Sequence, residues 1–189
     1  MLTWIIIGAV VVLLLLLVVG AYNRLVALDQ SANQAFADVD VQLKQRQDLI
    51  PNLVETVKGY AAHERGTLEA VIQARNAAAS ATSIDDRVQS ENILTGALGR
   101  LFALSEAYPQ LKADQNFLRL QSDLSDIENK LAAARRFFNN AVGEFNAVRR
   151  QFPTIIFAGL VGFGSDKPFF DVGESERASM NAAPPQVKF

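Results

Sequence analysis

The chain has 189 residues, contains no cysteine and carries a formal net charge of −2 at pH 7. Without cysteine it can form no disulfide, no thiolate nucleophile and no Cys-bound zinc site. A slightly acidic chain has no general electrostatic attraction to nucleic acid, so we expect no nucleic-acid partner. The length leaves room for one domain of ordinary size beside an anchoring segment.

The first part of the chain is an uncharged apolar run that covers residues 2–21. About 20 such residues in a helix are long enough to cross a hydrocarbon core of roughly 30 Å. Trp4 and Tyr22 lie near the two ends, where aromatic rings favour the headgroup region, and Arg24 follows as a snorkelling anchor. We therefore predict a single-pass transmembrane anchor over residues 1–22.

Two other interpretations of this run are weaker. A cleaved signal peptide fits the small residues Val19-Gly20-Ala21, but no Lys or Arg precedes the run, and its apolar core exceeds the usual ~7–15 residues. A buried soluble helix is disfavoured because every face of the run is apolar. Since Arg24 follows the span and no basic residue precedes it, we expect an inner-membrane protein with its bulk in the cytoplasm.

Residues 23–81 keep the helical spacing of apolar side chains, but Pro51 and Gly59 interrupt it. Two interpretations stay open at Pro51. Either it lies in the first turn of a new helix capped by Asp48, or it bends one continuous helix whose neighbours satisfy the freed carbonyl.

Two further helices are predicted, each with a start signal and a proline at its end. Ser83 begins a sequence that resembles a capping box, before a helix that Pro109 closes. Asp114 is a suitable N-cap for a long helix that reaches Phe152 and ends before Pro153. The long helix carries an apolar residue every three or four positions. This apolar seam needs a partner, either in the same chain or in another copy.

Several sequence blocks are similar to those of a known family. In chain order they are Tyr22-Asn23-Arg24-Leu25-Val26, residues 35–44 (AFADVDVQLK), residues 48–61 (DLIPNLVETVKGYA), residues 107–113 (AYPQLKA), Glu128-Asn129-Lys130, residues 137–142 (FFNNAV) and Phe152-Pro153. These blocks strongly resemble the LemA family of bacterial membrane proteins, over nearly all of residues 22–170. One departure is Phe138, where the family often has tyrosine.

The resemblance implies an all-α fold, in which an N-terminal transmembrane helix precedes an antiparallel four-helix bundle with long helices, here residues 23–152. It implies no established enzymatic activity, substrate or cofactor, so no catalytic residue is carried over. Asp48, Pro51 and Asn52 belong to one of the family-like blocks. Their structural explanation, a kink with a cap and core packing, is favoured over a docking site for a partner.

The residues that carry enzyme or metal chemistry are not grouped in the sequence. His63 is the only histidine, so the two-histidine zincin motif is missing, and we expect a solvated or helix-capping side chain. Asp48 and Glu55 can share a helical face, but the interleaved Lys44 and Lys58 favour a solvated, salt-bridged surface. We therefore expect no catalytic residue, no metal and no cofactor, and a protein that is not an enzyme.

Three residues stand out within the predicted helices. Arg46 falls where the apolar seam between Leu43 and Ile50 calls for an apolar residue. It either snorkels into solvent or pairs with a buried acid that fixes the helix register, and we expect snorkelling. Gly96 and Gly99 lie inside an apolar helix rather than after a strand, so we expect them to allow close approach of a neighbouring helix.

Residues 152–170, FPTIIFAGLVGFGSDKPFF, are too apolar for an ordinary exposed loop. The uncharged part is about 13 residues long and too short to span a bilayer as a helix. We expect residues 153–173 to lie in the membrane interface or to pack on the bundle or another subunit. The residues expected at this second membrane or subunit contact are Arg149, Arg150, Phe152, Ile155, Ile156, Phe157, Leu160 and Phe163. Residues 174–189 are polar and contain proline, as is typical of a mobile tail.

These features favour a membrane-anchored helical scaffold or interaction protein, which self-assembles through its long heptad-like helices into a coiled-coil homo-oligomer. The lipid bilayer and another membrane or envelope protein are further expected partners. The alternative is a membrane-bound sensor that holds a small ligand between its helices, for which Arg46 is the polar cue. A hydrolase is least favoured, since no nucleophile and base are grouped.

Overall fold

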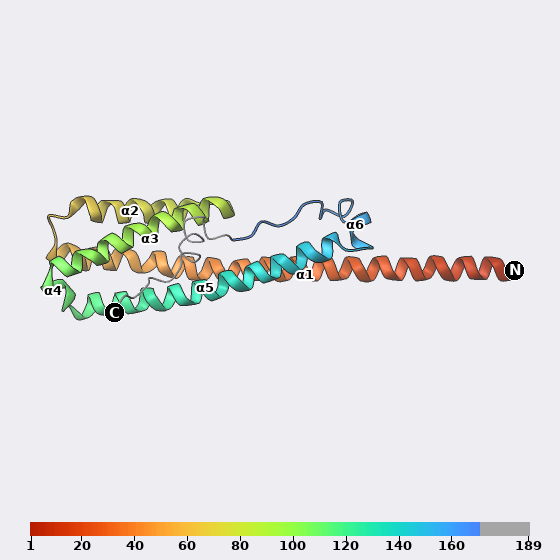
Figure 1. The fold of residues 1–189 in the computed structure, drawn as a ribbon, viewed down its shortest axis with the longest axis horizontal. Coiled ribbons are helices and arrows are strands. Elements are labelled where there is room, and N and C mark those ends of the chain that lie inside the picture. Colours follow the sequence, from red (N-terminus) through yellow and green to blue (C-terminus); the bar gives the residue numbers. More distant parts are fainter. Residues whose placement is uncertain (171–189) are drawn as a thin grey trace, which may run out of the picture. The chain divides into compact units, whose positions relative to one another are not determined.

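The computed structural model describes residues 1–170, which form six helices and no strand (Figure 1). The helices are α1 (Leu2–Tyr60), α2 (Arg65–Ser80), α3 (Ile84–Ala107), α4 (Pro109–Lys112), α5 (Gln115–Arg150) and α6 (Thr154–Phe157). The predicted all-α fold with an N-terminal apolar helix is confirmed. The predicted mobile tail, residues 174–189, lies outside the described residues, as does the end of the predicted segment 153–173 beyond residue 170.

Two predicted helix starts are confirmed, because a polar side chain satisfies a free backbone N–H at each. The Ser83 Oγ accepts a hydrogen bond from the Asp86 amide, 3.0 Å away, at the start of α3. The Asp114 carboxylate accepts one from the Phe117 amide, 2.8 Å away, at the start of α5. Helix α5 ends at Arg150, slightly short of its predicted end.

Helix α1 continues through Pro51, so the alternative of a new helix capped by Asp48 is wrong. Proline has no N–H, which leaves the carbonyl of Gln47, four residues earlier, without its helical hydrogen bond. The Arg75 Nε of α2 donates to this carbonyl at 3.3 Å. A neighbouring helix thus supplies the donor that Pro51 lacks, and α1 need not end there.

The described chain divides into two compact units. The first unit comprises residues 1–41 and 131–169, and the second comprises residues 42–130 together with Phe170. Helices α1 and α5 therefore each contribute residues to both units. The antiparallel four-helix bundle over residues 23–152 stays a prediction, because its helices differ in length and only parts of α1 and α5 belong to the second unit.

The second unit has one apolar core, to which α1, α2, α3, α4 and α5 all contribute. Its most deeply buried side chains include Leu53 and Val57 of α1, Val71 of α2, Leu94 and Leu101 of α3, Leu111 of α4 and Phe117 of α5. The rings of Phe102 and Phe117 meet edge to face, with their centroids 6.0 Å apart. The apolar spacing in the sequence therefore identifies the faces that α1, α2, α3 and α5 bury in this unit.

In the first unit, residues 25–41 of α1 pack against the part of α5 from residue 131 onward. The rings of Phe36 and Phe138 lie against each other with centroids 5.3 Å apart. A small buried cluster contains Leu25 of α1, Phe145 and Val148 of α5, and Ala158, which follows α6. The chain after α5 thus folds back within this unit and reaches α1 at Leu25.

Candidate functional site

The N-terminal part of α1 is an exposed apolar helix. Its most apolar window of 18 residues has a mean hydropathy of 3.2, and none of that window is buried. A core helix of a soluble protein would bury such side chains. Among residues 1–170, length and composition make this helix the one candidate for a membrane span. Trp4, Tyr22 and Arg24 are all exposed on it, as the predicted contact with headgroups requires.

A buried charge network lies in the second unit. Arg46 of α1 is 3% exposed and Glu91 of α3 is 1% exposed. The Arg46 Nη1 donates to Glu91 Oε2 at 2.8 Å, and its Nη2 donates to Thr95 Oγ1 at 2.8 Å. Glu128 Oε2 of α5 lies 3.2 Å from the same Nη2, and Gln47 Nε2 donates to Glu91 Oε1 at 3.2 Å. The network therefore joins α1, α3 and α5.

The prediction that Arg46 snorkels into solvent is wrong. Burying an unpaired guanidinium is costly, and the carboxylate of Glu91 on α3 makes its burial tolerable. The sequence carried a signal for this pair, which we missed. Glu91 lies between Val88 and Leu94 on the apolar seam of α3, so an acid and a base each interrupt an otherwise apolar face.

A cavity of about 370 Å³ adjoins this network in the second unit. It is lined by Arg46, Thr95, Leu98, Gly99, Phe102, Gln121, Leu124, Ser125 and Glu128. Apolar walls with a few polar groups are typical of small-ligand sites of this size. Arg46 already pairs with two carboxylates, so the charges beside the cavity largely satisfy one another.

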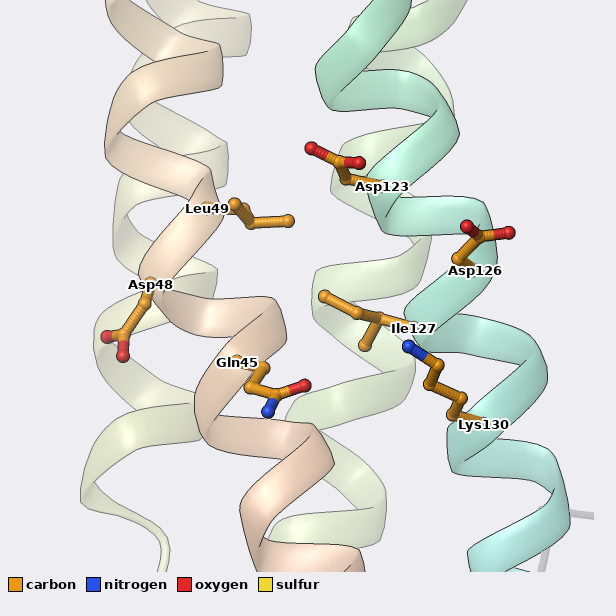
Figure 2. Close-up of a pocket in the computed structure, with 7 residues that line it drawn as sticks. All are labelled: Gln45, Asp48, Leu49, Asp123, Asp126, Ile127 and Lys130. Carbon is orange, nitrogen blue, oxygen red and sulfur yellow. The ribbon is translucent and has the colours of Figure 1, made fainter.

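A second hollow of about 410 Å³ is an open groove between α1 and α5 in the second unit (Figure 2). Leu49 of α1 and Ile127 of α5 point toward each other across it, and two aspartates line the α5 side. Asp48 points away from α5 and pairs with Lys44 of its own helix at 2.5 Å. Residues 1–170 contain no group of three His, Cys, Asp or Glu side chains suited to a metal ion.

The family-like block around Pro51 has a solvated outer surface. Asp48, Pro51 and Asn52 are all exposed. Glu55 pairs with Lys58 at 3.5 Å on the same helix, and both side chains are exposed. The predicted salt-bridged surface is confirmed, and these residues are not gathered into a catalytic arrangement.

Two predictions about single residues have opposite outcomes. His63 lies exposed between α1 and α2, as predicted. The prediction that Gly96 and Gly99 allow close helix approach is wrong, since a Cβ atom at either position would meet no atom within 4 Å.

Arg149 and Arg150, the two predicted cations of a second contact, both pair with Asp166. The Arg149 Nε donates to Asp166 Oδ1 at 2.8 Å. The Arg149 side chain is only 18% exposed, whereas that of Arg150 is 66% exposed. The Arg149 side chain is therefore largely buried in an ion pair within the protein. Sequence reasoning missed Asp166, although two adjacent arginines near an apolar segment were a signal to seek their counter-ion.

The predicted apolar contact residues divide into two sets. Phe157 and Phe163 are half-buried, and the Phe163 ring meets that of Phe145 edge to face with centroids 5.8 Å apart. The exposed set is Phe152 at 81%, Ile155 at 58%, Ile156 at 68% and Leu160 at 88%. Within its own unit the segment is thus covered only in part.

Two tyrosines at helix junctions of the second unit donate to carboxylates. The Tyr60 hydroxyl donates to Asp114 at 2.8 Å, and the Tyr108 hydroxyl donates to Glu64 at 3.2 Å. These hydrogen bonds raise the pKa of each tyrosine above 10.0. The amide of Phe117, followed by the Tyr60 hydroxyl, lowers the pKa of Asp114 below 3.8. These two tyrosine–carboxylate hydrogen bonds connect helix ends with loops, which is a structural role.

An exposed apolar helix that continues without a break into helical cores defines a membrane-associated helical protein. The model of the LemA family matches residues 35–189. The chain therefore belongs to the LemA family, and the resemblance seen in the sequence blocks is confirmed.

Curated relatives are similar to the chain at low identity. Magnetosome protein MamQ of Magnetospirillum gryphiswaldense is 24% identical over 168 residues, which cover 75% of the chain and 62% of the relative. Magnetosome protein MamQ 2 of Paramagnetospirillum magneticum is 22% identical with the same coverage. Protein LemA of Metamycoplasma hominis is 25% identical over 169 residues, which cover 87% of the chain and 75% of the relative. The chain thus spans less than two thirds of the magnetosome relatives.

Proposed function

We propose that this protein is a membrane-anchored, non-enzymatic helical scaffold, which self-assembles and offers its helical units to other membrane or envelope proteins. The observation that carries the proposal is helix α1, which contains the exposed apolar span and contributes residues to both helical units. The names of the relatives refer to the magnetosome or to the family and not to a reaction, which supports a non-enzymatic role.

Self-assembly needs apolar surface that the chain's own cores leave uncovered. Most of the α5 seam does not offer it, because Leu124, Leu131 and Phe145 are buried inside the chain. Apart from residues 1–24 and the segment after α5, the exposed large apolar side chains of the first unit are Val41 at 51% and Phe137 at 56%. Exposed aromatic side chains are frequent anchors of protein interfaces. Phe137 is therefore the side chain that best supports contact between copies.

The mass of the full-length protein in detergent, measured over a range of concentrations, tests self-assembly. Leu118→Asp is a matched control for Phe137→Asp, since Leu118 also lies on α5 and is 48% exposed. We expect a discrete oligomer that Phe137→Asp dissociates and Leu118→Asp leaves intact. A native chain that stays monomeric at every concentration contradicts the proposal.

We infer an inner-membrane location with the helical units in the cytoplasm, because the basic residue Arg24 directly follows the span. The chain has no native cysteine, so a single Ser122→Cys change at an exposed position of α5 reports the side of the membrane. An impermeant maleimide should label this cysteine only after the cells are permeabilised. Labelling in intact cells would reverse the orientation.

A second function, small-ligand binding, is favoured by the cavity of about 370 Å³ beside Arg46. Leu98 and Phe102 offer it apolar walls, and Gln121 and Ser125 offer hydrogen-bonding groups. Native mass spectrometry of the extracted protein tests this function. A bound mass that disappears in Ser125→Trp, which fills the cavity, supports it, and a native chain without bound mass contradicts it.

A further inference from the structure

The segment after α5 is a defined part of the first unit. Ala158 is 2% exposed and packs in the buried cluster that contains Leu25. The backbone of Lys167 exchanges two hydrogen bonds with the Asn146 side chain, at 2.9 and 3.0 Å. The Lys167 Nζ pairs with Asp29 of α1 at 2.9 Å. These contacts tie the middle and the C-terminal part of the segment to α1 and α5, so its outward-facing side chains have defined positions.

Four large apolar side chains of this segment are more than half exposed. They are Phe152, Ile155, Ile156 and Leu160, and we refer to them as the apolar patch. Scattered apolar residues are normal on a protein surface, but several large ones gathered between residues 152 and 160 indicate a surface that contacts an apolar phase or a partner.

The position of the segment on α1 identifies that apolar phase. Ala158 packs with Leu25, which follows the last residue of the apolar run, Ala21, by about one helical turn or ~6 Å of rise. The headgroup zone outside the hydrocarbon core is itself about 5–7 Å deep. Figure 1 shows α6 beside α1 at the point where the N-terminal part of α1 continues alone. A bilayer centred on the apolar run therefore has its headgroups at the level of this segment.

We propose that the apolar patch is a second membrane contact, which inserts into the headgroup region of the bilayer that α1 crosses. The occupant is lipid, because the buried cluster of Ala158 and Leu25 holds the patch about one helical turn from an apolar helix that is itself long enough to cross a bilayer. Arg24 is exposed on α1, whereas Arg149 and Arg150 both pair with Asp166, although the Arg150 side chain stays 66% exposed. The contact is therefore mainly apolar, and anionic lipid strengthens it without being required. This inference rests on the membrane anchoring proposed above.

Quenching by lipid tests the contact in the full-length chain. The protein, which has no native cysteine, is reconstituted into phosphatidylcholine vesicles that contain a lipid with a nitroxide near its headgroup. An environment-sensitive fluorophore is attached at Ile155→Cys or, as a matched control, at Ile93→Cys of α3; these positions are 58% and 56% exposed. We expect the Ile155 probe to be quenched several-fold more than the Ile93 probe, with or without added phosphatidylglycerol. Equal quenching, or quenching only with phosphatidylglycerol, would overturn the proposal.

A double variant tests the apolar patch itself. Ile156→Asp with Leu160→Asp changes two exposed positions, so the helical content should persist while the Ile155 probe loses its quenching by lipid. Unchanged quenching in this variant would overturn the proposal, as would protection of the probe that rises with protein density, which would identify a second copy as the occupant. Failure of the native chain to float with the vesicles would instead refute the anchoring itself.

Discussion

Replacing one member of the buried Arg46–Glu91 pair should destabilise the protein far more than replacing both. Glu91→Leu leaves Arg46 with Thr95 at 2.8 Å and the half-exposed Glu128 at 3.2 Å. Arg46→Met leaves Glu91 with only Gln47, at 3.2 Å, among the contacts described above. The stranded carboxylate is thus the less well satisfied of the two, and Arg46→Met should be the more damaging single change.

The magnitude follows from the burial of both groups. Removing one partner of a buried ion pair costs about 3–5 kcal/mol, and we place Glu91→Leu near the lower and Arg46→Met near the upper end. For a chain of this size, 3–5 kcal/mol corresponds to a fall in melting temperature on the order of 10 °C. The double variant carries no buried charge at these positions and should recover to within about 1 kcal/mol of the native chain.

The assay is thermal unfolding of the full-length protein in detergent, followed by circular dichroism of the helices. Asp48→Asn is a matched control, because Asp48 forms an exposed pair with Lys44 and its loss should cost less than about 0.5 kcal/mol. If Arg46→Met alone raises the melting temperature, or the double variant is the least stable of the set, the reasoning is wrong.

Three further predictions use the same unfolding assay. Gly96→Ala should stabilise the protein by about 0.5–1 kcal/mol, because the position is helical and a Cβ atom meets no neighbour; destabilisation would show that a neighbour does approach. Arg75→Ala should destabilise the native chain more than it does in a Pro51→Ala background, where the carbonyl that Arg75 satisfies regains its helical donor; equal effects would contradict the bridging role of Arg75. The lowered pKa of Asp114 contributes stability that is present above pH 3.8 and is lost as the pH falls through its folded value. Asp114→Asn should remove this acid sensitivity, and an unchanged acid transition would exclude Asp114 as its source.

Much of the fold could be predicted because the signals that encode it act over a few residues. Ser83 and Asp114 each meet an amide three residues ahead, so cap and helix start are visible in the sequence together. The apolar run before Arg24 is likewise a local property of composition. Apolar spacing gives the buried face of a helix for the same reason.

Contacts between distant parts of the chain could not be predicted in this way. Spacing shows that Arg46 belongs to a buried face. Whether its side chain reaches solvent or pairs with an acid 45 residues away depends on which helix lies opposite. Whether the helix continues through Pro51 likewise depends on Arg75 of the next helix. The orientation of the Arg149 side chain depends on Asp166, which lies beyond the apolar segment. The local sequence around each of these residues does not contain its partner. The residues could therefore be recognised as unusual, but their roles could not be predicted.

The retention of residues 2–22 in the mature protein tests the central claim, that α1 is a membrane anchor, most directly. Membranes that contain the protein are washed with alkaline carbonate, and the intact mass of the chain is measured in the membrane and wash fractions. We predict that the washed membranes hold a chain that retains residues 2–22. A chain shortened after Ala21 and recovered in the wash would show a cleaved signal sequence and contradict the anchor.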